Sequence, residues 1–378
     1  MHILIIANAY PDKRNPVPGI FVEQQAIGLK ENGVKTGVIN VELKKITSIF
    51  RPLLKKESYS RKSIAVLKRT GYNFTPFLPY YHKLFTPLYY FDLFNQYIKE
   101  NGKPDIIHAH FGLWAGNAAM LISKKFNIPY VVTEHTSYFA EKKYSNYELR
   151  ILASVYELSS KLIVVSDFLK QEIKKALGIK KDFTIIPNMI DVDKFKYMPN
   201  IKKKKQIISV GALIKTKGCK NLIKGFKNLL INHPDYLLII IGDGPDKNDL
   251  IKLIKNLNLQ EKVILKGTLS PEEIAIILNE SVCYALASEF ETFGISYIEA
   301  LACGIPVVAT KCGGPEGYVN ETNGILCEIN DENQITSALE KIILNIHHYN
   351  PSHLSLEIKK EFSKERVTSL LKEVYLKI

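Results

Sequence analysis

Short apolar runs alternate with longer segments of mixed polarity along both halves of the chain. In the first half, runs of strand length occupy residues 2–7, 105–108, 130–133 and 162–166. In the second half, similar runs occupy residues 206–210, 236–241, 262–266, 282–287 and 306–309. Gly, Pro, Asn or other polar residues bound each run, and segments of helix length separate them. This pattern predicts two parallel α/β sheets with right-handed crossover connections.

A chain of 378 residues is long for one hydrophobic core, so we expect two domains. The boundary is expected within residues 191–205, because residues 197–200 and the four lysines at 202–205 are typical of an exposed linker. We assign residues 1–192 to an N-terminal domain and residues 193–355 to a C-terminal domain. Ligands bind at the carboxyl ends of the strands in open α/β sheets, so two such sheets are expected to face a central cleft.

Residues 281–310 form the most informative segment. The pattern predicts a strand over 282–287, a polar loop over 288–292, and a helix over 294–302 that Gly304 and Pro306 end. Glu291 then lies just before the helix N-terminus, and Glu299 lies about one and a half turns inside the helix. Free backbone N–H groups at a helix N-terminus favour an anion such as phosphate.

This segment, with its E-x7-E spacing, resembles the family 4 retaining glycosyltransferases of the GT-B fold, also called glycosyltransferase group 1. The resemblance extends over most of the chain, and only residues 44–100 lack a landmark of the family. The other matching motifs are Pro-x-x-Gly at 16–19, HAH at 108–110, TEHTS at 133–137, IPNMIDVDKF at 186–195, VGALIKTKG at 210–218, GDGP at 242–245 and GGPEGYV at 313–319.

The resemblance implies two Rossmann-like domains with parallel sheets facing a central cleft, and a C-terminal helix within 356–378 that packs back on the first domain. It implies transfer of a hexose-type sugar from a nucleotide-diphosphate sugar, most commonly UDP-linked, with retention of configuration. The acceptor would be a saccharide or a lipid-linked saccharide in cell-surface polysaccharide or glycolipid assembly. A nucleotide-sugar epimerase of the same fold, a non-catalytic binding module and a nucleic-acid-binding protein are the alternatives.

Specific roles follow from the same resemblance. It implies catalytic roles for His110, Lys217 and Glu291, with Glu299 on the ribose hydroxyls and Glu291 near the donor sugar. The full donor-binding set is Gly19, Lys215, Lys217, Glu291, Thr292, Phe293, Gly294, Ile295 and Glu299. Members of the family usually carry an Arg where this chain has Ala212, so Lys215 or Lys217 is expected to carry more of the phosphate charge.

Several interpretations come from the residues themselves. Lys217 follows a strand and precedes a helix, where a lysine can reach a bound diphosphate. The apolar neighbours of Glu299 predict a buried, paired acid. The period of a strand places His108 and His110 on one face, with His108 as a hydrogen-bonded core residue. Glu134 and His135 follow the next strand, where they either orient the acceptor or make loop hydrogen bonds.

We expect neither a metal nor another cofactor, because no D-x-D element lies near these histidines and lysine and helix termini can take the diphosphate charge. A G-x-G-x-x-G fingerprint is also missing from the sequence. The five cysteines form no C-x-x-C pair and lie in largely apolar surroundings, which predicts reduced core thiols.

The formal charge of +13 favours anionic partners. The sequence shows no nucleic-acid motif, so we expect a nucleotide-sugar and an anionic membrane surface, with solvated surface lysine as the alternative. Residues 50–94 are rich in aromatic and basic residues and show no clear strand; the aromatics are expected to fill the core from helices. A basic cluster in this stretch is a candidate for lipid head groups: Arg51, Lys55, Lys56, Arg61, Lys62, Lys68 and Arg69.

No apolar run approaches the roughly 20 residues that span a bilayer. The chain begins with a predicted strand in place of a signal peptide. We therefore expect a cytoplasmic protein, with peripheral attachment to the inner face of the plasma membrane.

Overall fold

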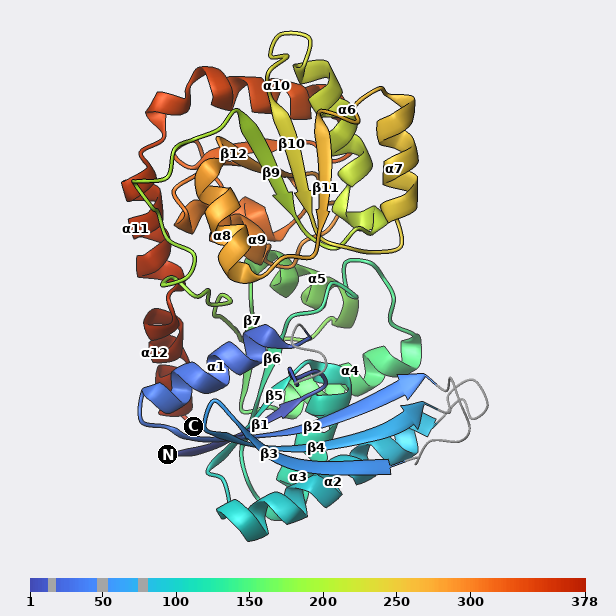
Figure 1. The fold of residues 1–378 in the computed structure, drawn as a ribbon. Helices are drawn as coiled ribbons and strands as arrows, with labels where there is room; N and C mark the ends of the chain where they lie inside the picture. Colours follow the sequence, from blue (N-terminus) through green and yellow to red (C-terminus); the bar gives the residue numbers. More distant parts are fainter. Residues whose placement is uncertain (13–17, 46–53, 74–80) are drawn as a thin grey trace. The chain divides into compact units, whose positions relative to one another are not determined.

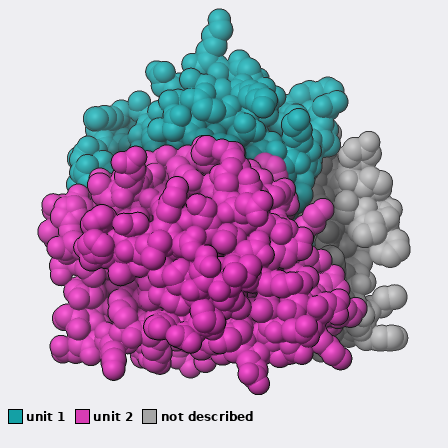
Figure 2. Space-filling model, turned by 90° about the horizontal axis from the view of Figure 1, so that it is seen from above, with its two compact units in different colours: residues 1–189, 364–378 teal, residues 190–363 magenta. Residues whose placement is uncertain are grey.

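The computed structural model describes residues 1–12, 18–45, 54–73 and 81–378. The chain divides into two compact units, which Figure 2 distinguishes by colour. Unit 1 comprises residues 1–189 and 364–378, and unit 2 comprises residues 190–363. The sequence-based boundary between 192 and 193 differs from this division by three residues. The predicted C-terminal segment 356–378 is divided between the two units, because a helix over Pro351–Phe362 belongs to unit 2 and a helix over Lys364–Tyr375 belongs to unit 1.

Among the described residues, unit 1 contains an eight-stranded sheet in the order β3-β4-β2-β1-β5-β6-β7-β8 (Figure 1). All neighbouring strands are parallel except the pair β3 and β4. The strands are β1 (His2–Ala7), β2 (Lys35–Lys45), β3 (Leu54–Arg61), β4 (Ile64–Asn73), β5 (Ile106–His110), β6 (Tyr130–Glu134), β7 (Lys161–Val164) and β8 (Phe183–Ile185).

Helices cover this sheet, and α1 and α2 lie on opposite sides of it (Figure 1). The helices are α1 (Ile20–Glu31), α2 (Tyr81–Asn101), α3 (Asn117–Phe126), α4 (Asn146–Leu158), α5 (Asp167–Leu177) and α12 (Lys364–Tyr375), with one π-helix turn at Gly112–Gly116. Because both faces of the sheet are covered, β1 and β5 are buried at every position, the histidines of β5 included, which explains why most of their residues are apolar.

Unit 2 contains a six-stranded parallel sheet in the order β11-β10-β9-β12-β13-β14. Its strands are β9 (Gln206–Val210), β10 (Leu237–Ile241), β11 (Val263–Gly267), β12 (Cys283–Leu286), β13 (Val307–Thr310) and β14 (Gly324–Cys327). Its helices are α6 (Cys219–Leu229), α7 (Lys247–Asn256), α8 (Pro271–Glu280), α9 (Ile295–Ala302), α10 (Glu332–Leu344) and α11 (Pro351–Phe362), with 3-10 turns at Lys215–Lys217, Gly314–Gly317 and Ile346–His348.

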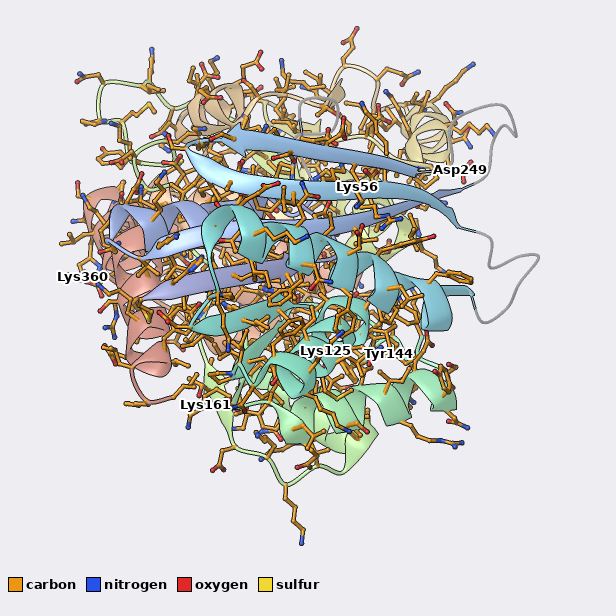
Figure 3. The ribbon with its side chains drawn as sticks, turned by 90° about the horizontal axis from the view of Figure 1, so that it is seen from below. Lys56, Lys125, Tyr144, Lys161, Asp249 and Lys360 are labelled. Atoms are coloured by element: carbon orange, nitrogen blue, oxygen red, sulfur yellow. The ribbon has the colours of Figure 1, made fainter. Side chains whose placement is uncertain are left out.

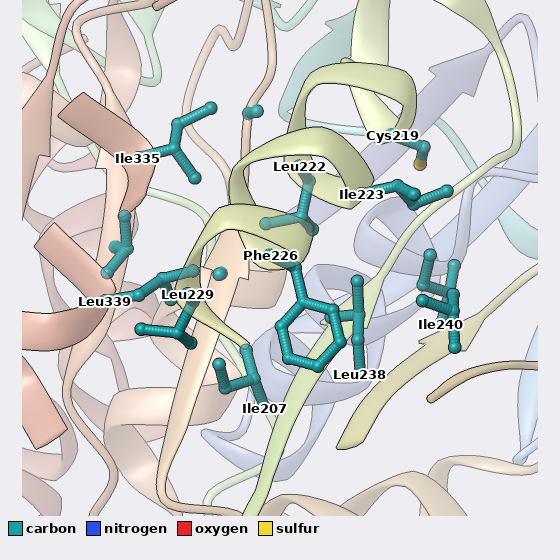
Figure 4. Close-up of a cluster of buried hydrophobic side chains, with 14 of the residues drawn as sticks. Ile207, Cys219, Leu222, Ile223, Phe226, Leu229, Leu238, Ile240, Ile335 and Leu339 are labelled. Carbon is teal, nitrogen blue, oxygen red and sulfur yellow. The ribbon is translucent and has the colours of Figure 1, made fainter. Parts of the chain in front are cut away.

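The core of unit 2 shows why these segments fold as they do. Leu222, Phe226 and Leu229 recur at helical spacing on α6 and are buried against the sheet and α10 (Figure 4). Ile207 on β9 and Leu339 on α10 complete the same cluster. The sequence also sets helix boundaries: Ser270 begins α8 with a capping box to Glu273, as Ser145 does on α4 with Glu148.

The predicted absence of strands from 50–94 is wrong for the hairpin of β3 and β4, which extends the sheet of unit 1. Its turn places Lys62 and Ser63 at positive φ, a geometry that suits a two-residue hairpin loop. The expectation that aromatics fill the core from helices is confirmed for α2, where Tyr90, Phe94 and Tyr97 are buried.

The basic cluster of this hairpin is largely neutralised within unit 1. Lys68 is buried and bridges Asp12 at 2.5 Å and Glu42 at 2.6 Å. The remaining pairs are Lys55 with Glu57, Lys56 and Arg69 with Asp92, and Arg61 with Glu23; Lys56 is labelled in Figure 3. Among the described residues, only Lys62 of this cluster lacks a carboxylate partner, and Arg51 lies outside the described residues.

The five cysteines are free and buried, as predicted, and burial raises the pKa of the Cys219 thiol to about 11. Reactive thiolates are therefore not expected at these positions. In the described parts of the chain, every helix is too short or too polar to cross a lipid bilayer.

Candidate functional site

The order of the strands in unit 2 indicates where a ligand binds. From β9 the chain proceeds in one direction through β10 and β11, and then returns to the other side of β9 with β12, β13 and β14. The strand order therefore reverses between β9 and β12, and crevices at such reversal points are the usual ligand sites of open parallel sheets. Residues 211–218 follow β9 and residues 287–294 follow β12, so both predicted donor-binding motifs lie at this position.

Lys217 and Glu291 form an ion pair between these two loops. Lys217 Nζ lies 2.6 Å from Glu291 Oε1, and Ser288 Oγ donates a hydrogen bond to the same oxygen at 2.8 Å. Only 10% of the Glu291 side chain and 24% of the Lys217 side chain are exposed. A pair this enclosed needs further hydrogen bonds to offset desolvation, and buried Ser288 provides one.

A glycine makes this approach between the loops sterically allowed. Gly218 adopts φ +64°, and a Cβ atom at this position would overlap the backbone carbonyl of Ala287 at the end of β12. Glu289 N also donates to Thr216 O at 2.8 Å, which joins the two loops directly. The glycine of the VGALIKTKG motif is thus required for the contact that brings Lys217 to Glu291.

The N-terminus of α9 is held open beside this ion pair. Gly294 occupies the N-cap position, and the Tyr318 hydroxyl donates to the carbonyl oxygens of Phe293 and Gly294 at 2.8 and 3.0 Å. Among the described residues, no acceptor is bonded to the backbone N–H groups of Phe293, Gly294 and Ile295. Unpaired N–H groups at a helix N-terminus form a binding site for an anionic group.

Glu299 lies on α9 between the fully buried residues Ile298, Ala300 and Leu301. Burial raises the pKa of its carboxyl to about 8, against a weaker opposing effect of Lys194, which pairs with Glu272 at 2.9 Å. Glu299 is partly buried, short of the predicted burial, and among the described residues no donor is bonded to its carboxylate, so the predicted pairing is not found.

Among the described residues, Lys215 takes no part in the ion pair of Lys217 and Glu291. It is exposed and lines a cavity of about 310 Å³ together with Asp246, Glu289 and Asn330. The described lining of that cavity includes neither Lys217 nor Glu291. The structure thus brings Lys217 and Glu291 together just before the α9 N-terminus, whereas Lys215 is exposed on the neighbouring cavity.

The strand order of unit 1 reverses in the same way, between β1 and β5. His110 ends β5, and His135 directly follows β6. His110 Nδ1 lies 3.0 Å from His135 Nε2, and the two rings stack at 5.3 Å. His108 packs against His110 at 4.4 Å, as their shared strand face predicts.

The three histidines differ in their hydrogen bonds. His108 uses both nitrogens, Nδ1 with the Tyr375 hydroxyl at 2.6 Å and Nε2 with Thr133 Oγ1 at 2.7 Å, which confirms it as a hydrogen-bonded core residue. Burial lowers the pKa of His108 and of His135 to about 3 and lowers that of His110 well below its usual value, so all three rings are neutral near pH 7.

Glu134 makes loop hydrogen bonds, one of its two predicted alternatives. Its buried carboxylate accepts from the backbone N–H groups of Gly112, His135 and Thr136 at 2.8, 2.9 and 3.0 Å, and from the Tyr156 hydroxyl at 2.6 Å. Four donors occupy its lone pairs. Glu134 therefore fixes the turns after β5 and β6 and so holds His135 in position.

Gly19 caps α1 at φ +74°, and a Cβ atom there would overlap the Ala9 carbonyl that follows β1. The first turn of α1 carries Phe21, whose ring lies 4.5 Å from His135. Phe111, next to His110, has φ +73°, an unusual conformation for a residue with a side chain and one that clusters at functional sites.

Sequence reasoning missed several residues that shape these sites. Ser288 and Tyr318 support the donor loop of unit 2, while Phe21, Phe111 and Asn188 surround His135 or His110 in unit 1. Asn188 and Tyr318 lie within the motifs at 186–195 and 313–319, and this membership was the only sign in the sequence that they contribute to a site. Among the described residues, no cluster of three or more His, Cys, Asp or Glu side chains could hold a metal ion.

Comparison with known proteins agrees with this geometry. The family model "Glycosyltransferase Family 4" matches residues 20–194, and the model "Glycosyl transferases group 1" matches residues 191–352. The chain is 25% identical over 289 residues to the N-acetyl-alpha-D-glucosaminyl L-malate synthase of Bacillus anthracis, covering 72% of this chain and 74% of that protein. It is 28% identical over 262 residues to the alpha-monoglucosyldiacylglycerol synthase of Acholeplasma laidlawii, covering 61% and 65%.

Among solved structures, Anabaena HepE in complex with UDP superposes with a TM-score of 0.78 at 17% identity, over 100% of both chains. This likeness shows the GT-B fold, with two α/β units whose sheets are parallel apart from the β3–β4 pair. More specifically, the chain belongs to the group 1 glycosyltransferases of family 4, whose two models together match residues 20–352.

Proposed function

We propose that the protein transfers a sugar from a UDP-linked donor to a saccharide or lipid-linked saccharide acceptor, with retention of anomeric configuration. The observation that carries this proposal is the Lys217–Glu291 ion pair beside the unpaired N–H groups of the α9 N-terminus. A diphosphate is the ligand whose charge fits a lysine and a helix N-terminus together. HepE, which shares the fold, binds UDP and UDP-glucose, and this supports a uridine nucleotide.

Unit 2 is assigned the nucleotide half of the donor. The backbone N–H groups of Phe293, Gly294 and Ile295 would hold the distal phosphate, and Lys217 Nζ would bind a phosphate oxygen. Glu291 pairs with Lys217 at 2.6 Å, so a bound diphosphate would compete with this carboxylate for the ammonium group. Glu291 is thereby released toward the hydroxyls of the donor sugar.

Glu299 is assigned to the ribose hydroxyls. Its carboxylate lacks a hydrogen-bond donor among the described residues and is partly buried, so two neighbouring hydroxyl groups would supply the missing donors. Binding would then return its pKa toward the usual range, because hydrogen bonds to the ionised form favour that form. This couples nucleotide binding to loss of a proton from Glu299.

Catalysis would rest on stabilising the leaving group. As the bond from the sugar to the diphosphate breaks, negative charge would grow on the phosphate oxygens, and Lys217 and the α9 N-terminus would stabilise it. The acceptor hydroxyl would attack on the face that the diphosphate leaves, and the diphosphate would take the acceptor proton. Protein groups supply the positive charge in this scheme, so we propose that the reaction needs no bound metal.

We also propose an acceptor class and a cellular location for the enzyme. The A. laidlawii relative is named for a diacylglycerol glycolipid, which supports an acceptor at a membrane surface in cell-surface glycolipid or polysaccharide assembly. Arg61, Lys68 and Arg69 are paired and at most 24% exposed, which removes them from this role. Lys55 and Lys56 are also paired, with Glu57 and Asp92, but their side chains are 59% and 47% exposed. We therefore propose peripheral contact of the cytoplasmic enzyme with anionic lipid through the exposed side chains of Lys55, Lys56 and Lys62.

A panel of nucleotide-sugars incubated with the enzyme tests the function. Release of UDP from one of them, faster with a saccharide acceptor present, supports the transferase. Conversion of the donor into an epimer without any acceptor would instead identify a nucleotide-sugar epimerase of the same fold. Binding of UDP without turnover of any donor would identify a binding module.

A further inference from the structure

Unit 2 has another cavity at the amino edge of its sheet, opposite to the edge from which the Lys217 and Glu291 loops emerge. The volume of this cavity is about 540 Å³, and none of the residues assigned to the sugar donor is part of its described lining. Four lining residues lie within three positions of the starts of β9, β10, β12 and β13: Lys203, Tyr236, Val282 and Pro306. The cavity is therefore a site apart from the proposed donor site.

Most of the cavity wall is apolar. Val282, Ile305 and Pro306 line it from the edge of the sheet. Tyr236 and Tyr349 also line it, and both rings are half-buried because they pack against the core of unit 2. Cavities of this size, with apolar and aromatic walls and a few polar groups, are typical of sites for small organic molecules.

The N-terminus of α11 is held at the same cavity. Gly304 adopts φ +75°, and a Cβ atom there would lie 2.8 Å from the Pro351 carbonyl oxygen, at the first residue of α11. Asn350 caps the helix by accepting a hydrogen bond from His353 N at 3.1 Å. Asn350 and Pro351 both line the cavity. The positive end of the α11 dipole therefore lies at the cavity, where it favours a negative charge.

Lys203 adds a positive charge. The residue as a whole is exposed, but its Nζ donates a hydrogen bond at 2.9 Å to the carbonyl oxygen of the fully buried Ser281. Among the described residues no carboxylate pairs with Lys203, whereas the adjacent Lys204 pairs with Glu280 at 2.6 Å. Burial lowers the pKa of the Lys203 ammonium group to about 8. This ammonium group has three N–H donors, so a ligand can accept from those that Ser281 does not use.

The charges at the cavity select one kind of ligand. Its described lining contains no Asp or Glu, so nothing in that lining neutralises Lys203. One negative charge on a ligand would pair with Lys203, whereas a second charge would lie against an apolar wall without a partner. A carboxylate meets both conditions, and an apolar remainder of the ligand would bury against the wall.

We propose that this cavity binds a small monocarboxylate with an aromatic or alkyl body, with its carboxylate on Lys203 and its body against Tyr236 and Tyr349. The site lies wholly within unit 2 and does not depend on the proposed transfer reaction.

Calorimetric titration of the full-length protein tests the charge requirement. The probes are 3-phenylpropionate and hexanoate, and their amides, 3-phenylpropanamide and hexanamide, are neutral probes of the same shape. At least one carboxylate should bind with a Kd below about 10 mM, and its amide should bind at least tenfold more weakly. Absence of binding by both carboxylates, or equal affinity for a carboxylate and its amide, would overturn the proposal.

Variants then test the location of the site. Lys203→Gln should weaken binding of the carboxylate at least tenfold and leave the amide unchanged, whereas Lys204→Gln should bind both as the wild type does. Ile346→Trp should block both probes, because exposed Ile346 lines the cavity and a larger side chain would fill it. The control Ile231→Trp changes an exposed residue outside the described lining and should have no effect. Wild-type affinity for the carboxylate in folded Lys203→Gln and Ile346→Trp variants would show that it binds elsewhere and would overturn the proposal.

Discussion

Replacement of Glu299 by Gln should stabilise the free protein while weakening its binding of UDP. The carboxyl has a folded-state pKa of about 8 because of burial, against 4.5 for an unperturbed glutamate. The folded protein therefore binds a proton that the unfolded chain has released, and stability falls as pH rises from 4.5 to 8. Glutamine removes this proton uptake and with it the loss of stability.

The size of the effect follows from the pKa difference. Each unit of difference corresponds to about 1.4 kcal/mol, so the wild type loses up to about 4 kcal/mol between pH 4.5 and pH 8. Water around the partly buried carboxyl reduces this loss to the order of 2 kcal/mol. The Glu299→Gln variant should thus be more stable by that amount at pH 8 and should match the wild type near pH 4.5.

UDP should reverse the order of stability. At a UDP concentration about 100 times the wild-type Kd, binding adds about 2.7 kcal/mol to the wild type, whereas a variant with 100-fold weaker affinity gains only about 0.4 kcal/mol. Urea unfolding of each protein at pH 5 and pH 8, with and without UDP, measures its free energy of unfolding under these four conditions. Glu321→Gln, at an exposed acid of the same unit, is the control and should change none of them. The reasoning is refuted if Glu299→Gln differs from the wild type equally at both pH values, or if it retains the full stabilisation by UDP.

Three further outcomes are expected. Lys217→Ala should lower kcat about 100-fold or more while acceptor binding is unchanged, and EDTA should leave wild-type activity intact. Near-native turnover of the Lys217→Ala variant, or loss of wild-type activity in EDTA, would contradict the assignment of the positive charge to protein groups. Gly218→Ala should lower the free energy of unfolding by about 2 kcal/mol or more, because both φ +64° and the Ala287 carbonyl oppose a Cβ atom. The control Gly317→Ala has open space around the added Cβ atom, so chemical unfolding should show almost no change. Replacing Lys55, Lys56 and Lys62 by Gln should reduce co-sedimentation with anionic but not neutral liposomes, and equal sedimentation of variant and wild type would show that these lysines are only a solvated face.

Most buried parallel strands were predictable because their sequences are predominantly apolar. The bounds of β1 and β9 match the predicted ranges, and the other seven predicted strands each differ by one or two residues at an end. The parallel strands β2 and β8 were not predicted. The hairpin of β3 and β4 was missed because its cations are typical of a surface segment. Buried Lys68 shows why this inference fails: two carboxylates from elsewhere in unit 1 neutralise it. The short strand β14 gave no comparable signal.

The site was predictable as a set of residue types and not as a set of contacts. Motifs identified Lys217 and Glu291, but their ion pair joins residues 74 positions apart and depends on the close approach at Gly218. The sequence left two alternatives for Glu134, and only its four hydrogen bonds decide between them. Asn188 was seen as part of a motif, whereas its place beside His135 depends on how the chain folds back after β8.

The most direct test of the account is to measure UDP release from a panel of UDP-sugars and to determine, by proton NMR, the anomeric configuration of the first product formed. The account predicts that the wild type releases UDP from at least one α-linked donor and gives an α-configured product. It also predicts that Lys217→Ala releases almost none under the same conditions. A β-configured first product, or release of UDP that does not depend on Lys217, would contradict it.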